Sequence, residues 1–332
     1  MPQCRTRCLP QILLLILLGL PAFGKTPKID DVTHPEALLK AGRANDALAS
    51  LHSRVAHDKR DAQSLHLLSR VYYSVGLWDQ AIKNGERAVA IAPDNSRYHL
   101  WLGRAYGEKA ENSNPFSAFA LARKARTQFE KAVELDGENI EARSDLTEYY
   151  TEAPAFLGGG KDKARMQIEV IAKKEPSTAH YLSARLAEKD KNFSEAEREY
   201  KTAIQESKTP ADQWVNLASF YRQRSNFAAM AEAIEKASAA PRKHTSVLVD
   251  AASVLFQSHR ELPKAIELLR QYLALRDQDK AEDAPTFRAQ YLLGQVLEKS
   301  GDRAGAAREY EAALGLARDY EEARSALRRL RP

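Results

Sequence analysis

Cysteine is nearly absent from this chain of 332 residues, and the two that occur, Cys4 and Cys8, lie close to its start. The sequence after residue 8 therefore offers no thiol for a disulfide, a metal site or nucleophilic catalysis. Long apolar runs are also scarce. The most apolar stretch, residues 12–20, has nine residues, whereas a membrane-spanning helix needs about 20. We expect the stability of the fold to come from side-chain packing alone.

The first 24 residues have the order of a secretory signal peptide. Arg5 and Arg7 precede the apolar run, and Ala22-Phe23-Gly24 provides a small-x-small cleavage site. Because the run is short, we favour a cleaved signal at residues 1–24 over an uncleaved anchor, with residues 25–33 as a short linker. No cysteine follows the apolar core, so a lipid anchor at the cleavage site is not supported. We expect an exported protein, in a bacterial periplasm, with an extracellular location as the alternative.

Charge of one sign is not concentrated anywhere in the chain. The formal net charge of +5 falls to +3 when Arg5 and Arg7 leave with the signal, and positive and negative residues are interspersed. Proteins that bind nucleic acid usually carry a concentrated basic face. The short basic end at residues 328–331 is interpreted as a helix C-terminus, where cations interact favourably with the helix dipole. We therefore predict no nucleic-acid partner.

Motifs for catalysis or cofactor binding are missing as well. The stretch from Gly158 to Lys161 resembles part of a phosphate-binding loop, but Asp162 stands where that motif needs Ser or Thr, so a flexible turn is the preferred interpretation. The eight histidines form no metal-binding pair, and no serine nucleophile motif occurs. We predict that the protein is not an enzyme and holds no cofactor or metal. The rival hypothesis is an accessory domain of an enzyme.

A period of about 34 residues runs through the sequence, which is typical of repeat proteins built from one supersecondary unit. The residues that stand one period apart include Ser69 and Gly103, Tyr72 and Tyr106, Ala184 and Ala218, and Ala203 and Ala237. Apolar residues at helical spacing, turn glycines and a closing proline predict two helices in each unit. The period therefore favours a stack of helical hairpins.

The pattern within each unit resembles the tetratricopeptide repeat family. It is carried by Leu102-Gly103-Tyr106, Ala125-Phe129-Ala132, Ala196-Tyr200-Ala203, Trp214-Leu217-Ala218-Tyr221 and Gly294-Leu297-Gly301-Ala306-Tyr310-Ala313. The resemblance implies an all-α fold, a right-handed superhelical solenoid of antiparallel helix hairpins, and a scaffold that assembles protein complexes. It also implies that Gly103 and Gly294 lie where the two helices of a hairpin cross closely. The tryptophans Trp78, Trp101 and Trp214 are interpreted as packing residues.

The repeat array is expected to fill residues 34–332 with about eight hairpins. The spacing exceeds the period in three places, which predicts inserts near residues 111–120, 153–160 and 278–285. Inserts in repeat arrays form loops that often lie on a functional face. We expect a polar N-terminal cap near residues 35–61 and a C-terminal capping helix at 320–330, because end units have only one neighbour.

The residue that follows the small residue of each unit is expected to face the concave groove, by analogy with the family. The candidate peptide-binding residues are His66, Arg70, Tyr73, Arg104, Tyr181 and Arg185. Arginine grips carboxylates in a bidentate manner and aromatic side chains supply anchors, so the expected ligand is an acidic or C-terminal peptide. The structural alternative is an internal ladder in which Glu148 bridges Arg104 and Arg185. The function expected is an exported scaffold or adaptor, with a component of an envelope-assembly or polymer-export complex as the alternative.

Signal cleavage gives the first testable prediction. The exported protein should begin at Lys25, because the basic, apolar and small-x-small segments stand in the order that signal peptidase requires. N-terminal sequencing of the exported product measures this directly. Retention of residues 1–24 in a membrane fraction would contradict it.

Overall fold

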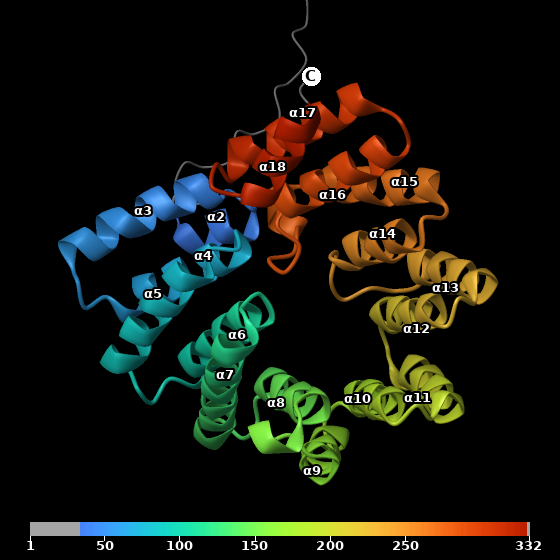
Figure 1. The fold of residues 1–332 in the computed structure, drawn as a ribbon, viewed down its shortest axis with the longest axis horizontal. Coiled ribbons are helices and arrows are strands. Elements are labelled where there is room, and N and C mark those ends of the chain that lie inside the picture. The colour runs from blue at the N-terminus through green and yellow to red at the C-terminus, as the bar shows by residue number, and fades with distance from the viewer. Residues whose placement is uncertain (1–33, 331–332) are drawn as a thin grey trace, which may run out of the picture.

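The structure is a computed structural model that describes residues 34–330, so the predicted signal peptide and linker lie outside the described residues. All regular elements in this range are helices, arranged as eight antiparallel hairpins followed by one further helix (Figure 1). The first helices of the hairpins are α2 (Pro35–Lys40), α4 (Ala62–Ser74), α6 (Ser96–Glu111), α8 (Ile140–Glu152), α10 (Pro176–Lys189), α12 (Ala211–Gln223), α14 (Val247–Ser258) and α16 (Thr286–Lys299). The second helices are α3 (Ala44–His57), α5 (Trp78–Ile91), α7 (Pro115–Leu135), α9 (Lys161–Ala172), α11 (Phe193–Glu206), α13 (Phe227–Ala239), α15 (Leu262–Leu273) and α17 (Arg303–Leu316). The final helix is α18 (Glu321–Leu330), and two 3₁₀ turns, η1 (Ala155–Leu157) and η2 (Asp277–Asp279), lie in the second and third inserts.

Figure 1 shows the first helices of the hairpins on the inside of a ring and the second helices on the outside. The predicted fold class, an all-α solenoid of antiparallel helix hairpins, is confirmed. Within residues 34–330, no helix is both long enough and apolar enough to span a bilayer.

The helix boundaries follow from capping and turn chemistry. Side chains of Asn95 and Asn139 accept hydrogen bonds from Tyr98 N and Ala142 N, at 3.2 and 3.0 Å, and so satisfy backbone donors that the helix leaves free. The turn inside a hairpin uses a residue with positive φ, and this position recurs with the repeat. It is occupied by Gly42 and Gly76 in the first two hairpins and by Lys191, Ser225 and His259 in three later ones.

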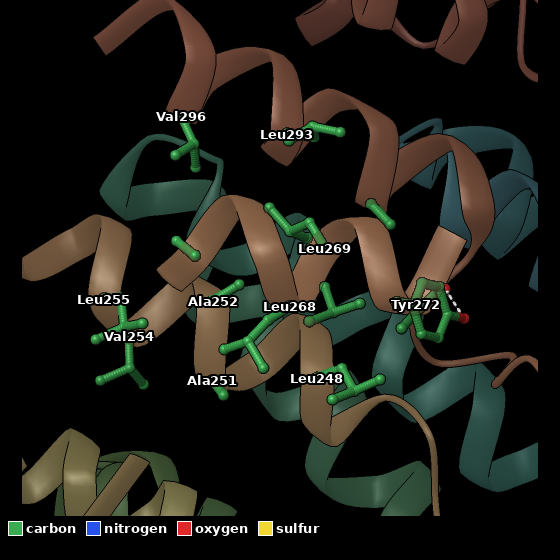
Figure 2. Close-up of a cluster of buried hydrophobic side chains, with 14 of the residues drawn as sticks. Leu248, Ala251, Ala252, Val254, Leu255, Leu268, Leu269, Tyr272, Leu293 and Val296 are labelled. Carbon is green, nitrogen blue, oxygen red and sulfur yellow. Dashed lines mark hydrogen bonds between the residues drawn. The ribbon is translucent and has the colours of Figure 1, made fainter. Parts of the chain in front are cut away.

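The hydrophobic core runs between the two layers of helices. Figure 2 shows one part of it, where Leu248 and Leu255 of α14, Leu268 and Leu269 of α15, and Leu293 of α16 gather between three helices. Alanines at the periodic positions, such as Ala203 and Ala237, are almost fully buried. Small residues let neighbouring helices approach closely, so the repeat sequence sets the spacing of the stack.

The packing role predicted for Gly103 and Gly294 is confirmed. A Cβ atom on Gly103 would lie 2.7 Å from the ring of Phe129, and one on Gly294 would overlap the ring of Tyr310. In both hairpins the aromatic ring of the second helix lies directly against the glycine of the first. Sequence pattern and packing therefore agree at the crossing point.

The two ends of the solenoid meet, which the sequence analysis does not anticipate. In place of two solvated caps, Leu38, Leu39 and Leu51 of the first hairpin share one apolar cluster with Phe287 and Tyr320 from the other end of the chain. Figure 1 shows α2 and α3 beside α17 and α18. The array is therefore a closed ring in which the end units cover each other.

Polar contacts reinforce this closure. Thr286 Oγ1 donates a hydrogen bond to Ala41 O at 2.9 Å, and Arg288 Nε donates to Ser74 O at 2.8 Å. Gly42 has φ +70°, and a Cβ there would collide with the backbone of Thr286. The glycine therefore serves both the turn and the close approach of the far end of the chain.

The first insert differs from the loop that the sequence analysis places between two helices. Residues 112–114 form a short turn, and from Pro115 onwards the insert is helical and lengthens α7 to 21 residues. Asn114 caps this helix by accepting from Ser117 N at 3.2 Å. The extra residues thus extend an outer helix beyond its hairpin partner.

Overpacking of the crossing point gives a stability prediction. Gly294→Leu should destabilise the fold by about 1–3 kcal/mol, because the new side chain must displace the Tyr310 ring. Gly315→Ala on α17 is the matched control. A Cβ there meets nothing within 4 Å, so the change should stabilise the protein by about 0.5–1 kcal/mol. Denaturant midpoints measure both effects, and an unchanged midpoint for Gly294→Leu would exclude a tight crossing.

Candidate functional site

The inside of the ring contains a cavity of about 750 Å³ that is bounded by α2, α4, α6, α8, the start of α10 and loops from the C-terminal half. Arg70 and Arg104 line it, and they stand one repeat period apart on α4 and α6. The Trp101 ring lies between them, with the two guanidinium carbons 4.8 and 4.9 Å from its centroid. Cations over the face of an indole are attracted to its π electrons. Trp101, predicted only as a packing residue, thus also forms part of the cavity wall.

Arg70 is held by the third insert. Its guanidinium makes a bidentate ion pair with Glu282, with Nε donating to Oε1 at 2.9 Å, and the side chain is only 5% exposed. Tyr272 fixes the insert: its hydroxyl accepts from Ala281 N at 3.1 Å and donates to Ala284 O at 2.5 Å. The chain therefore supplies its own carboxylate to the arginine that was predicted to grip a ligand.

Arg104 and Arg185 are paired internally too. Arg104 bonds Asp145 at 2.6 Å and Glu141 at 2.8 Å. Burial alone would lower the pKa of Arg104, but these two carboxylates raise it above its ordinary value. Arg185 pairs with Glu188 at 3.0 Å and Glu152 at 3.3 Å. All three predicted arginines thus stabilise the inner wall of the ring.

The structure contains an internal network of charged side chains, but its ion pairs differ from the Arg104–Glu148–Arg185 ladder expected from the sequence. Arg104 takes Asp145 rather than Glu148, and Glu148 instead accepts a hydrogen bond from Tyr181 at 3.3 Å. Asp145 and Glu141 lie one and two helical turns before Glu148 on α8, and this is the part of α8 that the Arg104 side chain meets. The interpretation of an internal charge network holds, with other carboxylates in it.

The remaining candidates lie close to the cavity but are mostly covered. His66 is 5% exposed and stacks on Tyr98 with ring centroids 4.6 Å apart. Burial, with Arg70 and Arg97 nearby, lowers the pKa of His66 to about 3, so its imidazole is neutral at physiological pH. Tyr73 donates to Glu108 at 3.2 Å and meets the edge of Trp101. These side chains support the wall of the cavity rather than project into it.

Three other cations of the cavity are exposed. Lys40, Arg97 and Lys243 line it, and none of them forms an ion pair within residues 34–330. The sequence analysis missed them because they lie outside the periodic position. Arg97 is seven residues before Arg104, which places both on one face of α6, and this spacing is the signal that could have found it.

The opposite side of the ring interior is acidic. Asp250 of α14 faces Asp212 of α12 and Asp283 of the third insert. The Asp250 side chain is in contact with solvent, but the surrounding protein removes part of its hydration. The loss of hydration, together with repulsion from Asp283 and Asp212, raises the pKa of Asp250 to about 7. Asp283 also lines the cavity of about 750 Å³, so charges of both signs lie close together in the interior.

The glycine turn of the second insert is structural. Its three N–H groups donate to carbonyls of the same segment, Gly158 to Ala155 at 2.8 Å, Gly159 to Pro154 at 3.2 Å and Gly160 to Tyr150 at 2.9 Å. None of these donors is free to cradle a phosphate. Within the described range, no group of three or more His, Asp or Glu residues is placed to hold a metal ion.

Comparisons with known proteins agree with this architecture. Residues 287–320 match the family model of the tetratricopeptide repeat, which supports the predicted family. A comparison with curated protein sequences found no match. Among solved structures, the chain is similar to a thermophilic TPR protein of Thermus thermophilus, with 20% identity, a TM-score of 0.46, and coverage of 56% of this chain and 98% of the other.

Two further solved structures are similar. A tetratricopeptide repeat protein from Parabacteroides merdae has 15% identity and a TM-score of 0.48, with 81% of this chain and 98% of the other covered. PilW, a type IV pilus biogenesis factor, has 15% identity and a TM-score of 0.44, with 64% and 94% covered. These likenesses carry no functional information about the present chain.

The raised pKa of Asp250 predicts a pH-dependent stability. Below about pH 4 the carboxyl is protonated in both the folded and the unfolded chain, and it has no effect. As the pH rises to about 7, the unfolded chain ionises first, so the folded state loses stability relative to the unfolded state. Asp250→Asn cannot ionise and should raise the Tm above pH 7, with the gain vanishing near pH 4. An equal gain at both pH values would contradict the assignment.

Proposed function

We propose that this protein is an exported, non-catalytic scaffold that binds an acidic segment of a partner protein inside its ring. A tetratricopeptide-type scaffold is suited to protein–protein interaction, and the observation that supports this particular ligand is the cavity of about 750 Å³. Lys40, Arg97 and Lys243 reach it without ion-pair partners in the described part of the chain, and these three unpaired cations face only two unpaired carboxylates, Glu175 and Asp283. The half-buried Trp101 adds apolar surface to the same cavity wall.

The energetics require several contacts at once. An exposed ion pair contributes only about 0–1 kcal/mol, so three cations alone would give weak binding. A carboxylate-bearing segment with an apolar residue against Trp101 would add the burial of apolar surface. Because the ring is closed, the fitting ligand is an extended segment or a chain end, which narrows the class of partner. A role in an envelope-assembly or export complex would use the same binding mode.

The predicted groove residues are poor choices for a test. Charge reversal at Arg70 would break the closure with Glu282, and reversal at Arg104 would break its pair with Asp145. Loss of binding in such variants could result from disruption of the fold and would not identify a ligand contact. The exposed cations are the informative positions.

The test is the double variant Arg97→Ala with Lys243→Ala, titrated with a fluorescent peptide rich in Asp and Glu at low and moderate salt. We expect binding to weaken by about tenfold, equivalent to about 1.4 kcal/mol, and to weaken further with salt because the contacts are exposed. The matched control is Lys83→Ala with Lys173→Ala, which removes two exposed cations from outer elements. Equal losses in both double variants, or no binding by the wild type, would refute the site.

A further inference from the structure

A second hollow, of about 480 Å³, lies between α6, α7 and α8. Its floor is apolar and is formed by Ala122, Ala125 and Phe129 of α7 with Leu157 of the second insert. Successive inner helices contact each other directly on both sides, α4 with α6 and α8 with α10, whereas α6 and α8 contact each other much less. The hollow is therefore an open groove between the inner helices α6 and α8, and the outer helix α7 forms its floor.

The rim of this groove is strongly acidic. Glu108 and Glu111 stand on α6, and Asp145, Glu148 and Glu152 stand on α8, against the single cation Arg104. Asp145 and Glu152 have arginine or lysine partners. Glu108, Glu111 and Glu148 have no ion-pair partner among residues 34–330.

These uncompensated carboxylates repel one another. Burial in the concave wall raises the pKa of Glu111, and the neighbouring Glu108 raises it further. Burial raises the pKa of Glu148 in the same way, and Asp145 and Glu152 add to the effect, while Arg185 and the hydrogen bond from Tyr181 offset it only in part. A cation placed in the groove would relieve this repulsion, whereas an anion would increase it.

Gly107 leaves space at the centre of the groove. It lies within α6 four residues after Gly103, but a Cβ on it would meet nothing within 4 Å. A glycine inside a helix lowers stability by roughly 0.5–1 kcal/mol relative to alanine, and here no close contact compensates for it. Packing of the ring therefore does not require this glycine.

Exposed aromatic rings stand next to the floor. Phe119 on the extension of α7 and Phe156 of η1 meet edge to face with centroids 5.5 Å apart, and they are 45% and 63% exposed. This contact joins the first and second inserts, and Arg126 Nη1 of α7 supports it by donating to Leu157 O at 3.0 Å. Departures from the repeat period thus build an apolar surface that continues from the groove floor.

We infer that this groove binds a short cationic amphipathic helix of a partner protein. The apolar face of that helix would lie on the exposed rings of Phe119 and Phe156. Its lysine or arginine residues would meet Glu111 and Glu148. The carboxylates run along two helices at spacings of three, four and seven residues, which matches basic residues on the two flanks of a helix lying between them. The site does not depend on the acidic-peptide cavity, and the ligand has the opposite charge.

The test uses the chain from Lys25 onwards and two designed peptides of about 18 residues, one built from leucine and lysine and the other from leucine and glutamate. Two variants probe the groove: Gly107→Leu, which fills it, and Glu111→Gln with Glu148→Gln, which removes charge. We expect only the cationic peptide to bind, and each variant to weaken it by about tenfold or more, equivalent to about 1.4 kcal/mol.

Matched controls separate this site from surface charge and from the other cavity. Gly315→Leu adds the same side chain at an open glycine of α17, and Glu169→Gln with Glu206→Gln removes two exposed carboxylates of outer helices. Neither control should change binding, nor should Arg97→Ala with Lys243→Ala. The inference is overturned if the wild type binds neither peptide, if both peptides bind equally, or if the controls weaken binding as much as the groove variants do.

Discussion

The apolar contact between the first and last hairpins determines the shape of the whole molecule. Leu38 and Leu51 pack in one cluster with Phe287 and Tyr320, residues that lie more than two hundred positions away in sequence. Burial of such side chains contributes about 1.5–3 kcal/mol each, so the cluster can hold a closed ring. Without it, each end hairpin would expose an apolar face, and the array would be an open superhelix.

Closure also creates the electrostatics of the interior. The third insert reaches Arg70 only because the two ends meet, and it then contributes Glu282 and Asp283 to the cavity wall. An enclosed interior keeps charges partly dehydrated, which explains the raised pKa values of Asp250 and Glu148. The two proposed binding sites lie on either side of Arg104, with the cavity that ring closure completes on one side and the acidic groove of α6, α7 and α8 on the other.

Much of the fold could be predicted because it is local and periodic. Gly103 and Gly294 predict where the helices cross. Gly42 and Gly76, which are 34 residues apart, occupy the same turn position in successive hairpins. The closure could not be predicted, since the contact of Gly42 with Thr286 joins distant residues and leaves no periodic signal. Arg70 and Arg104 line the cavity, but their carboxylate partners come from the third insert and from α8, at positions that a repeat pattern does not describe.

The distance between the two ends of the array tests the account most directly. Spin labels on Ala49→Cys of α3 and Ala312→Cys of α17 would report it, in a chain that begins at Lys25 and has no other cysteine. Both positions are exposed, and the two helices touch in the closed ring. Closure predicts a single narrow distribution at short distance in pulsed dipolar spectroscopy. A broad distribution centred at long distance, as in an open superhelix, would contradict it.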